Sequence, residues 1–275
     1  MKYSIFNNEI VKSHEIVLSE TNRGFLYGDG FFETIKFFDS CLFNFKNHFQ
    51  RIIFSSSLLS LEFDLSILAL EDLILKIINL NKINNGTVKV IVYRDSSGKY
   101  MPNINKSSFH ISCTKGSSDV FVLNTKPFKI DLYKDNFKAA TSLSNIKSLN
   151  SLLYVLASIY AKNNNFDDVL IINSKNKIIE STNSNLFLFL DNIIYTSPLS
   201  DGCVDGTMRR LILDILEKKY KVSIKSISES QVLDSSEIFL TNSISGVRWV
   251  GSYRNYNKNN RSVSSYLIDS LNALI

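Results

Sequence analysis

The sequence predicts an α+β fold of two modest domains, without the regular strand and helix alternation of a doubly wound sheet. Its 275 residues suffice for two cores, at about 100 to 200 residues per domain. Stretches that suit strands and stretches with helical spacing follow one another irregularly. Only 10 glycines and 3 prolines are present, so the loops that contain them are informative.

Composition narrows the class of protein. With 44% hydrophobic and 21% charged residues, the chain is neither disordered nor fibrous. Cys41, Cys113 and Cys203 are odd in number and far apart, so they form neither a disulfide framework nor a CxxC metal motif. We therefore expect a reducing, cytoplasmic location and no metal site.

Targeting and charge give two further expectations. Residues 1–18 lack the uninterrupted apolar run of a signal peptide, and the most apolar stretch, residues 58–80, carries four carboxylates. We expect no membrane partner. The net charge is +5, but Lys and Arg are scattered among Asp, Asn and Ser, whereas nucleic-acid binding requires a clustered basic face. No nucleic-acid partner is expected.

The first half, residues 1–118, is expected to form an N-terminal α+β domain. Apolar β-rich runs bounded by polar turns predict its strands, and apolar residues at helical spacing predict its helices. Asp39-Ser40 is predicted as a hairpin turn. The expected strands are 3–6, 16–18, 31–38, 42–45, 87–93 and 109–113, and the expected helices are 48–59 and 66–79.

The second half, residues 119–275, is expected to form a C-terminal domain. The boundary falls in the stretch 117–137, which is predicted to be extended and irregular and contains Pro127. Asp191-Asn192 is predicted as a second hairpin turn. The expected helices are 149–161 and 207–220, and the expected strands are 169–172, 178–180, 186–190, 193–196 and 236–241.

Three loops place small or glycine-containing backbone beside a strand end or a helix start. They are residues 24–30, 202–207 and 241–246. Amide groups at a helix N-terminus bind anions, so the second loop, which opens a helix, could hold a phosphate. Most glycine-containing turns are only turns, and this is the alternative for each loop. None of the three has the pattern of a Walker loop or of a dinucleotide-binding fingerprint.

Two ionisable residues are candidates for a catalytic or binding role. Lys147 is flanked by Ile146 and Leu149, and partial desolvation would lower its pKa and favour the neutral amine that forms a Schiff base. Glu180 follows two isoleucines, which suits a carboxylate held at a strand end. A surface lysine beside a helix start and a hairpin-edge charge are the alternatives.

His48 and Arg51 lie three residues apart on one face of an expected helix. The guanidinium of Arg51 could reach an anion through a forked pair of hydrogen bonds. His48 could instead serve packing or capping. Without a partner in the sequence, neither residue identifies a site.

Together these residues resemble the class IV aminotransferases, pyridoxal-phosphate enzymes that include branched-chain aminotransferases, D-amino-acid aminotransferases and aminodeoxychorismate lyases. The matching segments occur in the family's order through most of the chain. They are Arg23-Gly-Phe-Leu-Tyr-Gly-Asp-Gly-Phe-Phe-Glu33-Thr, His48-Phe-Gln-Arg51-Ile, Ile146-Lys147-Ser-Leu-Asn150, Glu180-Ser-Thr-Asn-Ser-Asn-Leu-Phe187, Gly206-Thr-Met-Arg209 and Thr241-Asn-Ser-Ile-Ser-Gly-Val247.

The resemblance implies the two-domain fold-type IV architecture, that of D-amino-acid aminotransferases, with pyridoxal 5'-phosphate bound between the domains of a homodimer subunit. Lys147 would form the Schiff base and move the proton between substrate and cofactor. Glu180 would pair with the pyridine nitrogen. The implied phosphate contacts are Arg51, the Thr207 and Met208 amides, Ser243 and Ile244.

Departures from the family pattern concern the substrate. Thr207-Met208 stands where Ile-Thr is common, and a Met there is similar to some aminodeoxychorismate lyases. Ser151 replaces a tyrosine usual in branched-chain enzymes. Lys99 and Met101 replace the Arg and His that trap the carboxylate in D-amino-acid enzymes. The candidate substrate contacts are Tyr27, Phe32, Arg94, Lys99 and Tyr100.

The leading hypothesis is a pyridoxal-phosphate aminotransferase that moves an amino group from an amino acid to a 2-oxo acid. The alternative is 4-amino-4-deoxychorismate lyase, which uses the same lysine but releases pyruvate and 4-aminobenzoate. A third hypothesis is a protein that binds the cofactor without efficient catalysis. An unused site would not need to retain both Lys147 and Glu180, which argues against the third.

Overall fold

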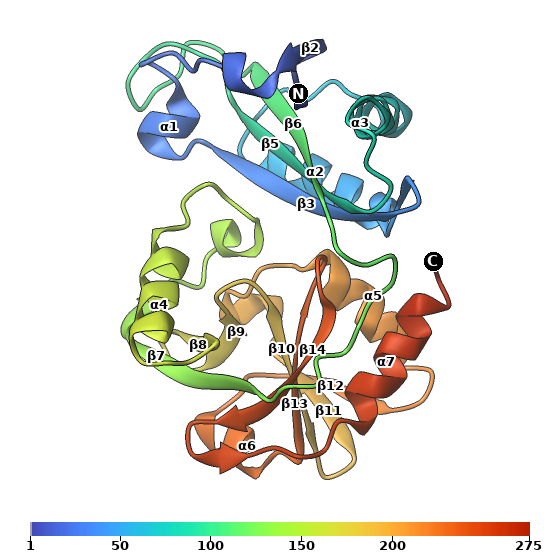
Figure 1. Ribbon diagram of the computed structural model, residues 1–275. Coiled ribbons are helices and arrows are strands. Elements are labelled where there is room, and N and C mark those ends of the chain that lie inside the picture. Colours follow the sequence, from blue (N-terminus) through green and yellow to red (C-terminus); the bar gives the residue numbers. More distant parts are fainter. Residues whose placement is uncertain (1) are drawn as a thin grey trace. The chain divides into compact units, whose positions relative to one another are not determined.

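The computed structural model describes residues 2–275, and they divide into two compact units. The first unit comprises Met1–Asp119 and Ile146–Asn150, and the second comprises Val120–Asn145 and Ser151–Ile275. Both units combine helices with sheets, which confirms the α+β prediction (Figure 1). The segment that contains Lys147 belongs to the first unit, whereas we expected it in the C-terminal domain.

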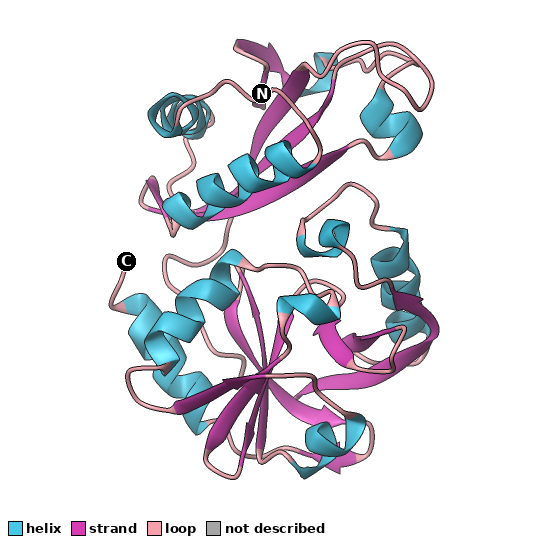
Figure 2. Cartoon of the chain, turned by 180° about the vertical axis from the view of Figure 1, so that it is seen from behind, coloured by secondary structure: helices cyan, strands magenta, loops and turns pink. Residues whose placement is uncertain are grey.

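The first unit is built on a six-stranded antiparallel sheet with the strand order β2-β1-β6-β5-β3-β4. Figure 2 shows helices α2 and α3 lying against this sheet. The elements are β1 (Tyr3–Phe6), β2 (Glu9–Lys12), η1 (Ser13–Glu15), α1 (Arg23–Tyr27), β3 (Gly30–Phe38), β4 (Cys41–Leu42), α2 (Phe45–Leu58), α3 (Ile67–Leu80), β5 (Gly86–Arg94) and β6 (Ser107–Lys115).

Alternation along the long strands gives this sheet one apolar face. Phe31, Ile35 and Phe37 of β3 are buried there, and they pack with Ile52 of α2 and Ile74 of α3 in one core. Period two in the strands and the 3.6-residue period in the helices bring these residues to a common side. The same alternation directs Phe32, Thr34 and Lys36 to the opposite face.

In this unit, the predicted hairpin turn at residues 39–40 is correct, and the strand predicted at residues 16–18 is wrong. Asp39 and Ser40 both have positive φ, at 45° and 63°, and join β3 to β4 as predicted. The strand expected at 16–18 is absent. The chain instead turns at Asn7, whose φ is 52°, and pairs β1 with β2. An Asn-Asn turn with a left-handed first residue is typical of a β-hairpin.

The second unit contains a sheet with the strand order β12-β11-β10-β13-β14-β7-β8-β9, in which β9 also pairs with β10. The sheet therefore closes on itself. The elements are β7 (Phe128–Lys138), η2 (Ser142–Asn145), α4 (Leu152–Asn163), β8 (Asp168–Asn173), β9 (Ile178–Ser181), β10 (Asn185–Leu190), β11 (Ile193–Thr196), η3 (Leu199–Asp201), α5 (Thr207–Leu216), β12 (Lys221–Ile224), α6 (Glu229–Asp234), β13 (Glu237–Asn242), β14 (Gly246–Tyr253), β15 (Tyr256–Asn257) and α7 (Ser262–Asn272).

Strand β7 lies in the stretch that we expected to be irregular. It pairs in parallel with both β8 and β14, so its backbone groups are satisfied by strands far away in the sequence. Its second half, with Lys134, Asp135 and Asn136, has the polarity of a loop and concealed the strand. Tertiary pairing overrides local preference here.

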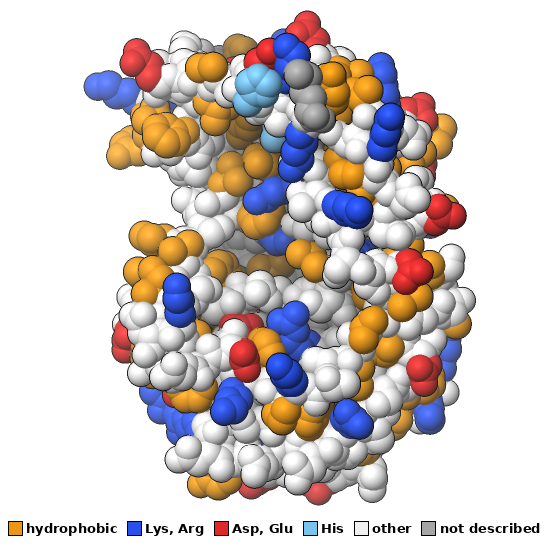
Figure 3. Space-filling view, in the orientation of Figure 1, with side chains coloured by type: hydrophobic (Ala, Val, Ile, Leu, Met, Phe, Trp, Pro, Cys, Tyr) orange, Lys and Arg blue, Asp and Glu red, His pale blue; other side chains and the backbone are white. Residues whose placement is uncertain are grey.

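The surface in Figure 3 shows Lys and Arg side chains spread among other types, without one continuous basic block on that face. Among residues 2–275, no helix combines the length and the apolar character needed to cross a membrane.

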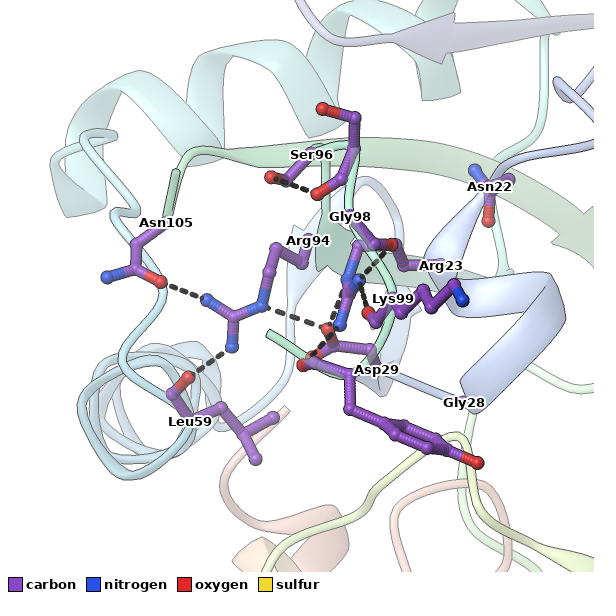
Figure 4. A network of polar contacts seen from close by, with 12 residues as sticks. Asn22, Arg23, Gly28, Asp29, Leu59, Arg94, Ser96, Gly98, Lys99 and Asn105 are labelled. Atoms are coloured by element: carbon purple, nitrogen blue, oxygen red, sulfur yellow. Dashed lines mark hydrogen bonds and ion pairs between the residues drawn. The ribbon is translucent and has the colours of Figure 1, made fainter. Parts of the chain in front are cut away.

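A buried charge network fixes the loops of the first unit (Figure 4). Asp29 Oδ2 accepts hydrogen bonds from Arg23 Nε at 2.8 Å and from Arg94 Nε at 2.9 Å. Arg94 also donates to the Leu59 and Ser60 carbonyls and to Asn105 Oδ1.

Arg23 extends the network into the loop after β5. It donates to the carbonyls of Gly98, Lys99 and Tyr100. Gly30, next to Asp29, approaches the β5 backbone so closely that a Cβ would lie 2.3 Å from the Val92 carbonyl oxygen. This close approach requires glycine and explains part of the first motif.

We predict that Asp29→Asn destabilises the protein by about 3 kcal/mol, the low end of the range for breaking a buried ion pair. The substitution leaves two buried guanidinium groups without their shared carboxylate. Urea unfolding measures the change, with Asp64→Asn, at an exposed carboxylate, as the control. Equal stability of the two variants would contradict the role of Asp29.

Candidate active site

A short antiparallel pairing positions Lys147 in the first unit. Ser148 forms a bridge with Phe31 at the start of β3. The Phe32 amide donates to the Lys147 carbonyl and the Leu149 amide donates to the Gly30 carbonyl, both at 3.0 Å. Because β4 pairs only with the far end of β3, this end of the strand can accept the Lys147 segment.

The Lys147 amine lies among residues of the first unit. Its Nζ is 3.4 Å from Thr34 Oγ1 and 4.5 Å from the centroid of the Phe32 ring. Burial and the nearby charge of Arg51 lower the pKa of Lys147 to about 8, although Glu33 acts in the opposite direction. About a tenth of the side chains would therefore be neutral at pH 7. The expectation of a partly desolvated lysine is met.

Arg51 is held by Glu33, a carboxylate to which no sequence pattern assigned a role. Glu33, fully buried, accepts from Arg51 Nε and Nη2 at 2.7 Å each and pairs with His48 Nδ1 at 2.6 Å. Burial alone would raise the pKa of Glu33, but Arg51 and His48 outweigh it and hold the pKa below its ordinary value. Burial also lowers the pKa of His48. His48 and Arg51, three residues apart on α2, therefore both bind the Glu33 carboxylate of β3.

Glu180 is the buried carboxylate of the second unit. It lies on β9, and its Oε1 accepts from Lys138 Nζ and Tyr154 Oη, both at 2.7 Å. Its Oε2 accepts from the Val204 amide at 2.8 Å. Burial and the Glu180 charge raise the pKa of Tyr154 well above its usual value, so the phenol remains a donor. One oxygen is fixed by two side chains, and the other by one backbone group.

The loop from Val204 leads directly into helix α5. Asn185 Nδ2 donates to the Val204 carbonyl at 2.8 Å, so two neighbouring strands hold this loop. A Cβ on Gly206 would lie 2.0 Å from Asn185 Oδ1, so a larger residue there would displace the Asn185 amide that holds the loop. Gly206 is the N-cap of α5, and no side chain caps the helix there. The first amides of α5 are suited to an anion.

Two hydroxyl groups meet beside this helix start. Thr207 Oγ1 and Ser243 Oγ are 3.1 Å apart, although Ser243 follows β13 and is 36 residues away in the sequence. The Met208 side chain is buried, and its amide lies in the first turn of α5. The Ile244 amide donates to Asn242 Oδ1 at 2.9 Å, within its own loop. Thr207 and Ser243 are thus brought together, and Ile244 has another partner.

Of the candidate substrate residues, Phe32 lies beside Lys147, and the other four separate into two groups. Arg94 is committed to Asp29 and to three other acceptors, which favours a structural role over the expected carboxylate contact. Tyr27 and Tyr100 have ring centroids 5.6 Å apart, and Tyr100 is 88% exposed. Lys99 is exposed on the same loop. These three side chains form a surface group near α1.

Lys138, Tyr154 and Val204 are site residues that the sequence did not reveal. Tyr154 follows Lys147 by seven residues on an expected helix, a spacing that could have suggested an inward position. Lys138 lies at the end of β7, the strand we did not predict. No local pattern links either residue to Glu180.

The amine of Lys147 should deprotonate as the pH rises through about 8, because burial lowers its pKa from 10.5. Only the neutral amine attacks an aldehyde. Reductive methylation with formaldehyde, quantified by peptide mapping, should therefore accelerate from about pH 6 and level off above about pH 9. The exposed Lys115 is the internal reference. A Lys147 midpoint no lower than that of Lys115 would contradict the lowered pKa.

Comparisons with known proteins identify the family of the chain. The model of the family described as amino-transferase class IV matches residues 30–253. D-alanine aminotransferase of Staphylococcus epidermidis is 26% identical over 244 residues, covering 84% of each chain. D-alanine aminotransferase of Staphylococcus haemolyticus is 29% identical over 218 residues, covering 77% of this chain and 74% of the relative.

Solved structures share the fold. A putative 4-amino-4-deoxychorismate lyase from Legionella pneumophila has a TM-score of 0.88 and 26% identity, covering 95% of this chain and 96% of its own. The branched-chain aminotransferase of Thermoproteus uzoniensis, solved with norvaline, has a TM-score of 0.89 at 16% identity, covering 98% of this chain and 93% of its own. The family match spans most of the chain, including Lys147 and Glu180, and the protein belongs to the class IV aminotransferases.

Proposed function

We propose that this protein is a pyridoxal-phosphate-dependent aminotransferase that moves an amino group from an amino acid to a 2-oxo acid. The family is pyridoxal-phosphate-dependent, and its D-alanine aminotransferase members support transfer of an amino group. The observation that carries the proposal is the Lys147 amine, with a pKa of about 8, beside Thr34 and Phe32. An ordinary surface lysine would have neither the burial nor these neighbours.

The residues present fit the cofactor chemically. We assign the amine to Lys147, the phosphate contacts to Arg51, the Thr207 and Met208 amides and Ser243, and the ring-nitrogen contact to Glu180. The uncapped start of α5 and the paired hydroxyls of Thr207 and Ser243 supply donors that suit a phosphate. The Ile244 amide would contact the phosphate by giving up its hydrogen bond to Asn242 Oδ1.

When bound, pyridoxal phosphate supplies an aldehyde for the amino group and a ring that accepts the electron pair left on the substrate carbon. Lys147 then acts as the base, taking the proton from the substrate Cα and returning it at cofactor C4′. Its lowered pKa makes both directions accessible near neutral pH. Thr34 can hold the amine between these transfers by accepting a hydrogen bond from it.

Glu180 is assigned the ring nitrogen because it is a buried carboxylate whose two oxygens differ in the number of hydrogen bonds they accept. Lys138 and Tyr154 occupy Oε1, whereas Oε2 accepts a single hydrogen bond from the Val204 amide. A carboxylate oxygen accepts two hydrogen bonds, so Oε2 can also accept one from the ring nitrogen. This contact would keep the nitrogen protonated and strengthen the electron sink.

We further propose a homodimer in the cytoplasm. Both follow from the family expectation, and the three free cysteines Cys41, Cys113 and Cys203 are consistent with a reducing compartment.

A second function is favoured by a specific similarity. The Legionella pneumophila structure named as a putative 4-amino-4-deoxychorismate lyase covers nearly the whole chain at 26% identity. Met208 also agrees with some lyases of this family. A lyase would use the same Lys147 and Glu180 but would release pyruvate and 4-aminobenzoate.

An assay with separate substrates distinguishes the two functions. We predict that the protein with pyridoxal phosphate exchanges amino groups continuously when an amino acid and a 2-oxo acid are both supplied. Lys147→Ala should reduce this exchange at least about a hundredfold, because the base that moves the proton is lost. Lys115→Ala, at an exposed lysine, is the matched control.

The lyase predicts a different result in the same assay. With aminodeoxychorismate and no 2-oxo acid, a lyase forms pyruvate over many turnovers, whereas an aminotransferase stops after one half-reaction. If pyruvate forms in many-fold excess over enzyme and no amino exchange occurs, the protein is a lyase and the proposed aminotransferase function is wrong. Absence of both activities would contradict both functions.

A further inference from the structure

A single asparagine of the second unit, Asn145, holds the loop of residues 199–205. Its Nδ2 donates to the Leu199 carbonyl at 2.9 Å and to the Cys203 carbonyl at 2.8 Å. Its own carbonyl accepts a hydrogen bond from the Asp205 amide at 2.9 Å. Asn145 is half-buried and thus bonds to this loop at its start and near its end, through its side chain and its backbone.

The same loop packs closely on the chain that leads to Asn145. Gly202 has a φ of 97°, in the left-handed region that favours glycine. A Cβ on Gly202 would lie 3.1 Å from the Ala139 carbonyl oxygen and 3.1 Å from Ala140 Cα. The loop is therefore fitted against residues 139–145 along its length, and its hydrogen bonds to Asn145 are part of this packing.

One peptide group links Asn145 to Glu180. The carbonyl of Cys203 and the amide of Val204 belong to the same planar trans peptide group, so they point in opposite directions. The carbonyl accepts from Asn145 Nδ2 and the amide donates to Glu180 Oε2, both at 2.8 Å. Asn145 and Glu180 thus hold opposite ends of one peptide group. Hydrogen bonds in such a chain polarise one another, which strengthens the bond to Glu180.

The other oxygen of Glu180 is tied to the residue before Asn145. Lys138 Nζ donates to Glu180 Oε1 at 2.7 Å and to the Ser144 carbonyl at 2.8 Å. Residues 144 and 145 therefore reach both oxygens of the carboxylate, Oε1 through Lys138 and Oε2 through the loop. The lysine keeps Oε1 in place by itself, whereas the direction of Oε2 depends on the peptide group that Asn145 holds.

We propose that Asn145 is a positioning residue, which fixes the direction in which Glu180 Oε2 faces the ring nitrogen of the cofactor. The inference rests on the proposed function, in which Oε2 accepts a hydrogen bond from that nitrogen. Without the Asn145 side chain, the peptide group before Val204 is free to rotate, and Oε2 loses the donor that orients it. The contact with the ring nitrogen then weakens, because hydrogen bonds depend steeply on angle.

Two cofactors that differ at one ring atom test this role. 1-Deazapyridoxal 5'-phosphate keeps the aldehyde and the phosphate but has a carbon in place of the ring nitrogen. The ratio of its dissociation constant to that of pyridoxal phosphate therefore measures the contact with Glu180. Isothermal titration into the full chain freed of cofactor should give a wild-type ratio of at least about ten, as expected for a hydrogen bond to a charged group.

Asn145→Ala should reduce this ratio at least about threefold, because the two residues share one hydrogen-bond network. A merely structural role of Asn145 would weaken the binding of both cofactors equally and leave the ratio unchanged. Asn145→Ser keeps one hydroxyl donor for the loop and should give an intermediate ratio. This smaller change supplies a result even if Asn145→Ala fails to fold.

Asn164→Ala is the matched control. Asn164 also donates from Nδ2 to a backbone carbonyl, that of Tyr160 at 2.9 Å, but it is exposed at the end of α4. This variant should keep the wild-type ratio. A ratio lowered equally in Asn164→Ala and Asn145→Ala would contradict a specific role of Asn145.

The outcomes separate the role of Asn145 from the proposed function. A wild-type ratio of at least about ten that stays unchanged in both Asn145 variants rejects the role of Asn145 alone. A wild-type ratio near one, in protein that binds both cofactors, rejects the assignment of Glu180 to the ring nitrogen and the role of Asn145 with it. Failure of the wild type to bind either cofactor would reject the proposed function itself.

Discussion

The pairing of Ser148 with Phe31 is the interaction on which the rest of the site depends. It adds five residues of the chain to the edge of β3, in a unit whose other residues precede position 120. The backbone bonds on either side of the bridge fix the Lys147 main chain, and the amine then lies beside Phe32 and Thr34. Without this pairing, Lys147 would lack the burial and the neighbouring charges that lower its pKa.

Two buried charges, Arg51 in the first unit and Glu180 in the second, are each held by a side chain of opposite charge. Glu33 holds Arg51 by two parallel hydrogen bonds, and Lys138 holds Glu180. Such pairs cost desolvation and are weak evidence for stability. Their value here is orientation, because a guanidinium and a carboxylate kept in one geometry can contact a ligand without further ordering.

Much of the fold and part of the site could be predicted from the sequence, where the indications are local. The hairpin at Asp39-Ser40 and the helix after Gly206 depend on neighbouring residues, and both were predicted. The end of that helix at Leu216, four residues earlier than expected, and the polar strand β7 depend on packing. The contact of Lys138 with Glu180 spans 42 residues and has no pattern in the sequence. The placement of Lys147 in the first unit likewise depends on pairing across more than 100 residues.

The identity of the reactive amine is the central claim, and reduction with borohydride tests it directly. Treating the protein and pyridoxal phosphate with borohydride fixes the cofactor covalently on the lysine that carries it, and peptide mapping then locates it. We expect labelling at Lys147, with Lys89 and Lys138 unlabelled. Labelling at another lysine, with Lys147 unmodified, would contradict the assignment.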